Sequence, residues 1–406
     1  MSKKPRIILV ANSVPLPATD FLKYKLFGLS KSFNLHFICW DSTLNRKKFY
    51  GKYADELPAK NIHLFYDKLD VPSLIMLLFM NLSQLLFNPV ISWRLLYKLI
   101  SHYGWNAKKL FTKFSLYYPL AALKPDIIHF EYGTLAHQFS DIKDYIRCKT
   151  SVSFRGYDIN YTGLEDKNYY QTVWNNFDGF HFLGNDLKNR AIKRGYHQTK
   201  NEALIPPGID TEFFAPTGDD KRKDKFVIAS VGRLAWKKGY EYGIQAASIL
   251  KARGIPVEYR IIADGNYRQP ILFTIAEFGL ENEVRIITAK SPTEVKAQME
   301  EAHVLLHPAL SEGFSNAVLE AQAMQLPVVT TNADGLSENV EDGVTGFVVQ
   351  TYDANALAEK LNWCYQHPEH MKTMGEAGRK RVIDKFRIEA QLKKFEAFYS
   401  SLYNEH

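Results

Sequence analysis

Apolar and polar positions in the second half of this chain follow a regular alternation of strand-like and helix-like segments. Short apolar runs rich in β-branched residues predict six strands, at 226–231, 258–263, 284–287, 304–306, 327–330 and 346–349. Apolar residues recur at helical spacing between them, over 240–253, 269–278, 292–302 and 316–324. Such an alternation indicates βαβ units and a largely parallel sheet.

The first half repeats this pattern less regularly. Strands are predicted at 6–10, 35–39, 62–65, 126–130, 151–154, 179–182 and 203–205. We therefore expect an α/β protein with two doubly wound domains, whose ligands bind outside the carboxyl ends of the strands. The predicted domains are 1–205 and 226–387, and a Pro-Pro-Gly turn with a polar stretch predicts a linker at 206–225. A helical segment at 388–406 could join the first domain.

Length and composition limit the class of protein. A chain of 406 residues has room for two or three domains, and 46% hydrophobic with 23% charged residues excludes disordered and fibrous classes. Three widely separated cysteines, Cys39, Cys148 and Cys364, exclude a disulfide framework and a structural zinc site. The apolar run at 7–10 is too short for a signal peptide. These features predict a cytoplasmic protein.

Charge is distributed unevenly along the chain. The total is +7, but residues 1–215 carry +10 and residues 216–406 carry −3. A basic first half favours an anionic partner, such as nucleic acid, a phosphate-bearing substrate or an acidic membrane surface. Solubility alone would explain the same excess.

An uncharged stretch at 71–93 interrupts the α/β pattern. It is nominally long enough to span a bilayer, but prolines, asparagines and other polar residues interrupt it, and Arg94 and Lys98 follow. Two helices are the better prediction. They are either buried in the first domain or expose an apolar face that lies on the inner face of the cell membrane.

The strongest chemical signal is a strand–loop–helix junction at 311–324. Gly313 and Ser315 suit a turn and a helix N-cap, which leave backbone N–H groups free to bind phosphate, with Phe314 between them. Glu312 and Glu320 offer carboxylates that could accept hydrogen bonds from two sugars flanking a diphosphate. A glutamate that balances the helix dipole would also explain Glu320.

Two further signals follow strands of the same half. Gly232 allows a close backbone turn, Arg233 offers bidentate contact to phosphate and Lys238 a point charge, although surface cations are usually only solvated. Asp264 and Gly265 end another strand, where an ordinary Asp-Gly turn is the simpler explanation.

Together these motifs resemble a known family. The patterns G-R-x4-K-G at 232–239, D-G at 264–265 and H-P-x3-E-G-F-x5-E at 307–320 occur in order and in strand context. They resemble the retaining glycosyltransferases of GT-B fold, family four, in particular the exopolysaccharide-type subset. The resemblance covers roughly 185–350. It implies two Rossmann-like domains facing each other across a cleft, with a nucleotide sugar on the second domain and a saccharide acceptor on the first.

The resemblance assigns roles to individual residues. Arg233 and Lys238 match the pair that holds the donor diphosphate, Glu312 the group against the donor sugar, and Glu320 the group that binds the ribose. The loop from Gly313 to Ser315 meets the donor through backbone amides, and Gly232, Asp264 and Gly265 belong to the same donor site. The family uses no metal, and this chain has no D-x-D motif. We therefore expect neither a metal nor another cofactor.

Several positions depart from the family pattern. The loop after the first strand, at 12–21, lacks the frequent Gly-Gly pair. The resemblance places His129, Glu131, Arg155 and Asp158 on the acceptor side, although Glu131 and Arg155 replace histidines that the family often has. Gln325 stands where a helix-ending glycine is usual, which predicts modest strain if a left-handed conformation is kept.

The sequence thus predicts a metal-independent, retaining glycosyltransferase that moves a sugar from a nucleotide-diphosphate sugar to a saccharide or lipid-linked saccharide, in cell-surface polysaccharide synthesis and without nucleic acid. A glycosidase or phosphorylase with two carboxylates is one alternative. A GT-B nucleotide-sugar epimerase and a catalytically silent sugar-nucleotide-binding partner are two others. A dehydrogenase fits worst, because no G-x-G-x-x-G follows the first strand.

Overall fold

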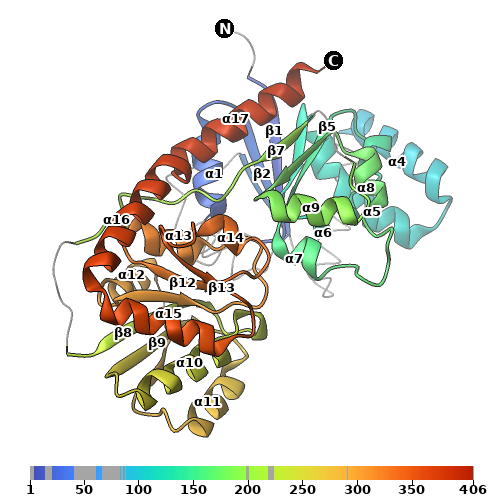
Figure 1. The fold of residues 1–406 in the computed structure, drawn as a ribbon. Helices are drawn as coiled ribbons and strands as arrows, with labels where there is room; N and C mark the ends of the chain where they lie inside the picture. Colours follow the sequence, from blue (N-terminus) through green and yellow to red (C-terminus); the bar gives the residue numbers. More distant parts are fainter. Residues whose placement is uncertain are drawn as a thin grey trace. The chain divides into compact units, whose positions relative to one another are not determined.

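Two parallel sheets organise the chain in the computed structural model, which describes residues 4–13, 21–40, 61–65, 83, 86, 88–197, 201–217, 224–289 and 291–405 (Figure 1). The chain divides into two units. The first comprises Met1–Phe182, Lys188–Ile205 and Leu392–His406, and the second Leu183–Leu187 and Pro206–Gln391. The division between Ile205 and Pro206 falls where the predicted linker begins, and the described part of that linker belongs to the second unit.

The sheet of the first unit has, among the described residues, seven parallel strands in the order β3-β2-β1-β4-β5-β6-β7. Ile7 to Ala11 are fully buried, as expected for a parallel strand covered on both faces. The strands are β1 (Arg6–Ala11), β2 (Asn34–Trp40), β3 (Ile62–Phe65), β4 (Ile127–Phe130), β5 (Lys149–Phe154), β6 (Gly179–Phe182) and β7 (Glu202–Leu204). The described helices are α1 (Phe21–Ser30), α4 (Pro89–Tyr103), α5 (Ala107–Ala122), α6 (Gly133–Gln138), η3 (Ile142–Asp144), α7 (Gly156–Asn160), α8 (Gln171–Asn176) and α9 (Asn185–Lys193), whose first residues, up to Leu187, are assigned to the second unit.

Helix α17 (Ile388–Asn404) completes the core of the first unit. Phe395, Phe398, Tyr399 and Leu402 are buried in the same apolar cluster as residues of β1, β2 and α1. The helix therefore supplies a large share of the core although it lies almost 200 residues beyond the preceding part of this unit.

The sheet of the second unit has six parallel strands among the described residues, in the order β10-β9-β8-β11-β12-β13. They are β8 (Phe226–Arg233), β9 (Val257–Asp264), β10 (Val284–Ile287), β11 (Val304–His307), β12 (Val328–Thr331) and β13 (Gly346–Val349). The connections contain η4 (Trp236–Lys238), α10 (Tyr240–Ala252), α11 (Arg268–Glu277), α12 (Pro292–Glu300), α13 (Asn316–Ala323) and α14 (Leu336–Asn339), and α15 (Ala354–Gln366) and α16 (Pro368–Lys385) follow. The core packs α10 and α15 against β8 and β9.

The predicted α/β architecture is confirmed, and each predicted strand is present with ends within two residues of the expected ones. Gln325 has the left-handed conformation expected to carry strain, with φ of 60°. Residues 14–20 of the loop after β1, and 71–82 with 84, 85 and 87 of the uncharged stretch, lie outside the described residues, as do 218–223 of the linker. Among the helices that are described, none is long and apolar enough to cross a membrane.

Candidate active site

In the second sheet, β8 and β11 are neighbours, and the order in which the chain adds strands reverses between them. In open parallel sheets, ligands bind at the carboxyl ends of the strands beside such a switch point. Here those ends are Arg233 on β8 and His307 on β11. The residues with the strongest chemical signals, Arg233, Lys238 and Glu312, lie at or just beyond these two ends. The topology therefore gathers them at one edge.

The loop after β8 packs closely on the loop after β11. Gly239 has φ of 61°, and a Cβ atom there would stand 2.2 Å from the carbonyl oxygen of Pro308, so only glycine fits. The Leu310 N–H donates to the carbonyl of Lys237 across 2.8 Å. At Gly232 a Cβ would stand 3.2 Å from Cε of Lys238, so the aliphatic part of the lysine side chain packs over the glycine backbone.

Lys238 and Glu312 form an ion pair at this junction. Both side chains are largely buried, and Nε2 of His307 lies 3.9 Å from the Glu312 carboxylate. Burial raises the pKa of Glu312, but the charge of Lys238, with contributions from His307 and Lys237, holds it well below its usual range. Burial and the charge of Lys238 lower the pKa of His307. Glu312 is therefore a permanent anion that orients Lys238.

Asp334 holds the loop that carries Glu312. Its carboxylate accepts hydrogen bonds from the Ser311 hydroxyl and, across 3.0 Å, from the Glu312 N–H. The Gly335 N–H donates to the carbonyl of Glu312. Asp334 itself has φ of 47°, a left-handed conformation that aspartate tolerates better than most residues. This clamp keeps the turn before α13 in one shape.

The start of α13 presents open backbone donors. Asn339, fully buried, accepts from the Ser315 N–H and donates to the Ser315 carbonyl, which fixes where the helix begins. In the described part of the chain, no acceptor meets the N–H groups of Gly313, Phe314, Asn316 and Ala317. Open N–H groups at a helix start attract phosphate and other anions.

Arg233 adds an exposed cation to this edge. Within the described residues it makes no ion pair, and in the β8–β9 ladder it stands opposite Asp264. Its charge reaches Lys237, whose pKa is lowered by burial and by Lys238 and Arg233, against the attraction of Glu312. The cluster thus holds three cations around one buried carboxylate, a field suited to a ligand with more than one negative charge.

Two predicted donor-site features have a weaker connection to this cluster. The Asp264 carboxylate accepts the N–H of Gly265 across 2.8 Å, as in an Asp-Gly turn. Glu320 lies one turn into α13 and is half-buried, and no hydrogen bond or ion pair to another described residue holds its carboxylate. Burial raises its pKa to about 7. The donor-binding roles of these residues stay predictions.

The predicted acceptor-side residues of the first unit meet in a buried polar network. His129 and Glu131 are fully buried at the end of β4, where the strand order also reverses, between β1 and β4. Lys25 of α1 donates to Glu131 across 2.5 Å and lies 3.0 Å from Nε2 of His129. Burial lowers the pKa of Lys25 to about 8, although Glu131 opposes that shift.

The network continues across the sheet. His129 contacts the hydroxyls of Ser151 and Ser153 at 2.9 and 2.8 Å, and Ser153 contacts Nδ1 of His181 at 2.7 Å. Burial holds the pKa values of His129 and His181 well below their usual range, so both rings are neutral. Tyr399 of α17 packs edge-on against His129, which closes this side of the network.

Arg155 and Asp158 lie beside the network and have different functions in the fold. Arg155 donates to the Glu131 carboxylate and carbonyl at 3.1 and 3.2 Å, and its side chain is 19% exposed. Asp158 accepts the N–H groups of Arg155 and Thr134, each at 3.0 Å, and so caps α7. Arg155 is therefore the predicted acceptor-side residue with most access to solvent. The acceptor roles of all four residues stay predictions.

Sequence reasoning missed Lys25, His307, Asp334 and Asn339. Lys25, Asp334 and Asn339 lie outside the local motifs that they support, because folding brings distant segments together, whereas His307 begins the pattern that contains Glu312. The pattern at 307–320 includes His307 without assigning it a role, and the sequence around Lys25, Asp334 and Asn339 gives no signal of their contacts with distant segments.

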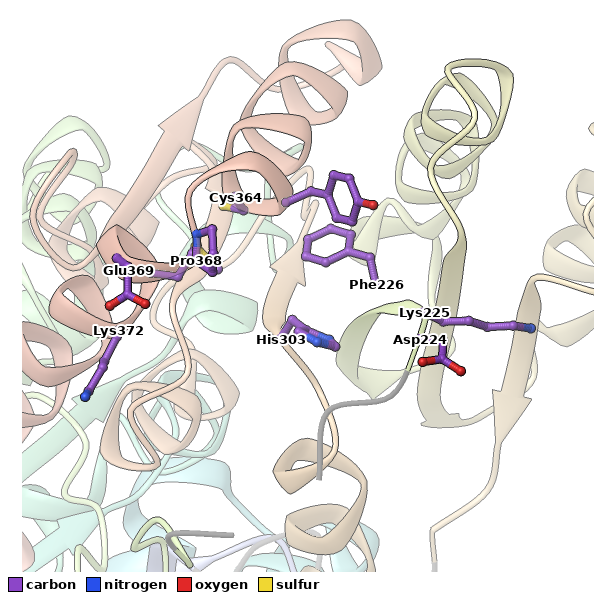
Figure 2. Close-up of a pocket in the computed structure, with 10 residues that line it drawn as sticks. Asp224, Lys225, Phe226, His303, Cys364, Pro368, Glu369 and Lys372 are labelled. Carbon is purple, nitrogen blue, oxygen red and sulfur yellow. The ribbon is translucent and has the colours of Figure 1, made fainter. Parts of the chain in front are cut away.

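A separate hollow of about 370 Å³ lies at the opposite edge of the second sheet (Figure 2). Phe226 and His303, which line it, stand at the amino ends of β8 and β11, whereas Arg233 and His307 stand at the carboxyl ends. It is therefore not part of the candidate site. Among the described residues, no group of three or more His, Cys, Asp or Glu side chains could hold a metal ion.

Known proteins are similar to the region of the chain that carries this cluster. The model of the family "Glycosyl transferases group 1" matches residues 214–381, which include all of the second-unit cluster. The chain is 32% identical over 228 residues to the capsular polysaccharide biosynthesis glycosyltransferase CapM of Staphylococcus aureus, covering 56% of this chain and 54% of CapM. It is also 32% identical to the putative colanic acid biosynthesis glycosyltransferase WcaL of Escherichia coli, covering 53% and 55%. The chain thus spans about half the length of these curated relatives.

Solved structures extend the likeness of the fold to the whole chain. Anabaena HepE in complex with UDP-glucose has a TM-score of 0.73 at 15% identity, covering 97% of this chain and 99% of HepE. The fold is therefore GT-B. Over residues 214–381 the chain is similar to the group 1 glycosyltransferases, the kind of family that the motifs had indicated.

Proposed function

We propose that this protein is a retaining glycosyltransferase that moves a sugar from a nucleotide-diphosphate sugar to a saccharide acceptor. The observation that carries the proposal is the meeting of Arg233, Lys238 and the open N–H groups of α13 at the switch point of the second sheet. Cations and helix-end donors at that place suit a diphosphate.

The proposed chemistry is stabilisation of a leaving group. The bond between the anomeric carbon and the diphosphate oxygen breaks, and negative charge grows on the departing phosphate. Arg233, Lys238 and the amides of Gly313 and Phe314 stabilise that charge more in the transition state than in the bound donor, which lowers the barrier. The fixed anion Glu312 keeps Lys238 in place and lies against the donor sugar.

Retention of configuration follows from front-side attack. The acceptor hydroxyl attacks the anomeric carbon from the face that the diphosphate leaves, and its proton passes to the departing phosphate oxygen. This route needs no enzymic nucleophile and no metal. Glu320 binds the ribose hydroxyls, because its carboxylate is not held by another described side chain.

The relatives suggest the biological setting. CapM and WcaL are named for capsular polysaccharide and colanic acid biosynthesis, and HepE was solved with UDP-glucose. We infer that this chain acts in cell-surface polysaccharide synthesis on a saccharide or lipid-linked saccharide, with peripheral contact to the membrane. The basic first unit supplies the acceptor side, where Arg155 is partly exposed.

A panel of UDP-, GDP-, ADP- and dTDP-sugars tests the proposal. One nucleotide sugar should raise the melting temperature and be hydrolysed slowly to free nucleotide without acceptor. With a saccharide acceptor, NMR of the product should show the anomeric configuration of the donor. An inverted product would contradict the retaining mechanism. Conversion of the donor to its epimer, or binding without any release of nucleotide, would contradict transfer.

A further inference from the structure

Helix α4 (Pro89–Tyr103) presents apolar side chains to solvent as well as to the core. Ser92, Leu95 and Leu99 are buried on its inner face, which packs against α5. On the other side, Val90, Trp93 and Tyr97 are 80, 58 and 75% exposed. We call these three residues the α4 stripe (α4 and α5 are the cyan helices of Figure 1).

The spacing of the α4 stripe makes it one continuous surface. Positions three, four and seven apart lie on the same face of a helix, so the three side chains form a row along the axis. An ordinary surface helix places charged and polar residues there. Trp105, in the turn after the helix, is 84% exposed and extends the apolar character past the end of α4. Such a group of exposed aromatic residues indicates an interaction surface.

The charges that α4 and α5 themselves carry all have one sign. The chain has no Asp or Glu between Asp70 and Asp126, and it has six Lys or Arg in that interval. Arg94 on α4 and Lys108 and Lys109 at the start of α5 are exposed, and within the described residues none of them forms an ion pair. The nearby acid Asp141 is occupied by Lys113 at 3.2 Å and by the Tyr103 hydroxyl at 2.6 Å.

We propose that the α4 stripe, with Trp105, Arg94, Lys108 and Lys109, docks on an anionic lipid bilayer. Indole and phenol rings favour the headgroup level of a membrane, where an apolar ring and a polar edge are both satisfied. The basic side chains add attraction to anionic headgroups at the same surface. Apolar insertion and charge attraction are each weak alone and stabilise binding together. An apolar protein groove would match the row of rings but not the one-sided charge.

This docking surface deepens the proposed function and rests on it for one point, the lipid-linked acceptor. A transferase whose acceptor is anchored in a bilayer gains from being held at that surface, because the search for the acceptor becomes two-dimensional. Binding to vesicles is measured without any sugar transfer, so its failure and that of the proposed activity are distinguishable.

Flotation of the full-length protein with lipid vesicles tests the inference. One set of vesicles is pure phosphatidylcholine, and the other contains about one third phosphatidylglycerol, at about 0.05 and about 0.5 M salt. We expect flotation with the anionic set at low salt and much less at high salt. The partition coefficient should fall at least about tenfold in Trp93→Ser/Tyr97→Ser and in Lys108→Glu/Lys109→Glu.

Matched variants control for general effects of removing a ring or reversing a charge. Phe273→Ser removes a 66% exposed aromatic side chain on α11, and Lys193→Glu reverses an exposed charge on α9. Both should float like the unaltered protein, and all variants should keep its donor hydrolysis. No flotation with either lipid set, equal flotation of the α4 variants, or self-association abolished by Trp93→Ser/Tyr97→Ser would overturn the proposal. The last result would assign the surface to a second copy of the chain.

Discussion

The two sheets of this protein place charged residues at the same topological position and use them differently. In the first unit, the strand end beside the switch point carries His129 and Glu131, which are fully buried and held by Lys25 and Arg155. In the second, one of the two strand ends beside the switch point carries Arg233, which faces solvent, near helix-end N–H groups without acceptors among the described residues. A charge cluster whose members satisfy one another stabilises a fold, whereas one with unmet donors can bind a ligand.

The largest expected effect comes from disrupting the buried polar network of Lys25, His129 and Glu131 in the first unit. Lys25→Met removes a cation that pairs with Glu131 and leaves Arg155 as the remaining charged partner of this buried carboxylate among the described residues. Because an unpaired buried charge is costly, the free energy of unfolding of the first unit should fall by about 3 kcal/mol. Urea denaturation followed by circular dichroism measures it.

Lys31→Met is the control for that prediction, because Lys31 is exposed just after the same helix. It should change the stability by less than about 0.5 kcal/mol. If Lys25→Met is as stable as Lys31→Met, the network does not have the stabilising role given to it here.

The next effect concerns the cluster of Arg233, Lys238 and Glu312 in the second unit. Lys238→Ala and Glu312→Ala should each lower turnover at saturating donor by at least about tenfold with the fold intact, because each removes part of a preorganised field. Since the two residues form one ion pair, the loss in the double variant should be smaller than the product of the single losses. Lys385→Ala, an exposed lysine on α16, is the control. Near-normal rates in both single variants would refute the assignment of the site.

A smaller effect is a pH dependence of donor binding that Glu320 should cause and Glu312 should not. The pKa of Glu320 is raised to about 7, so its carboxyl is neutral below that pH and ionised above it, whereas Glu312 stays ionised. Only the ionised form accepts from both ribose hydroxyls. The KM for the donor should therefore fall a few-fold as pH rises from about 6 to about 8. Glu320→Gln should give a flat profile over this range, and an unchanged slope would remove Glu320 from the donor site.

The smallest expected effect is none. Activity should persist after incubation with EDTA and gel filtration, because the proposed mechanism neutralises the diphosphate with Arg233, Lys238 and backbone N–H groups. Loss of turnover that only Mg²⁺ or Mn²⁺ restores would show that these groups are insufficient.

Strand positions were predictable because their signal is local. A strand buried on both faces of a parallel sheet is apolar along most of its length, and runs such as 7–10 and 304–306 have that property. The positions of Arg233, Lys238 and Glu312 at one edge followed from the strands before them. The loops that carry these residues were therefore predictable without coordinates.

Contacts between distant segments were not predictable. The Lys25–Glu131 pair joins residues 106 positions apart, and the clamp of Asp334 on Ser311 joins residues 23 apart. A polar residue in an apolar helix, such as Lys25 in α1, has the same local appearance whether it reaches solvent or a buried acid. The exposure of the α4 stripe was not predictable either, because the pattern of apolar residues in a helix does not say which face packs on the core.

The first unit is built from segments at both ends of the chain, and this has a consequence for its biosynthesis. The last of its described strands is complete once residue 204 has been made, yet Phe395, Phe398, Tyr399 and Leu402, which pack into its core, emerge only after the second unit. At typical translation speeds that interval is on the order of ten to forty seconds. During it, the nascent first unit has an uncovered apolar side and is a substrate for chaperones. Synthesis rate and chaperone supply should therefore limit the yield of folded protein more than the equilibrium stability of the finished chain.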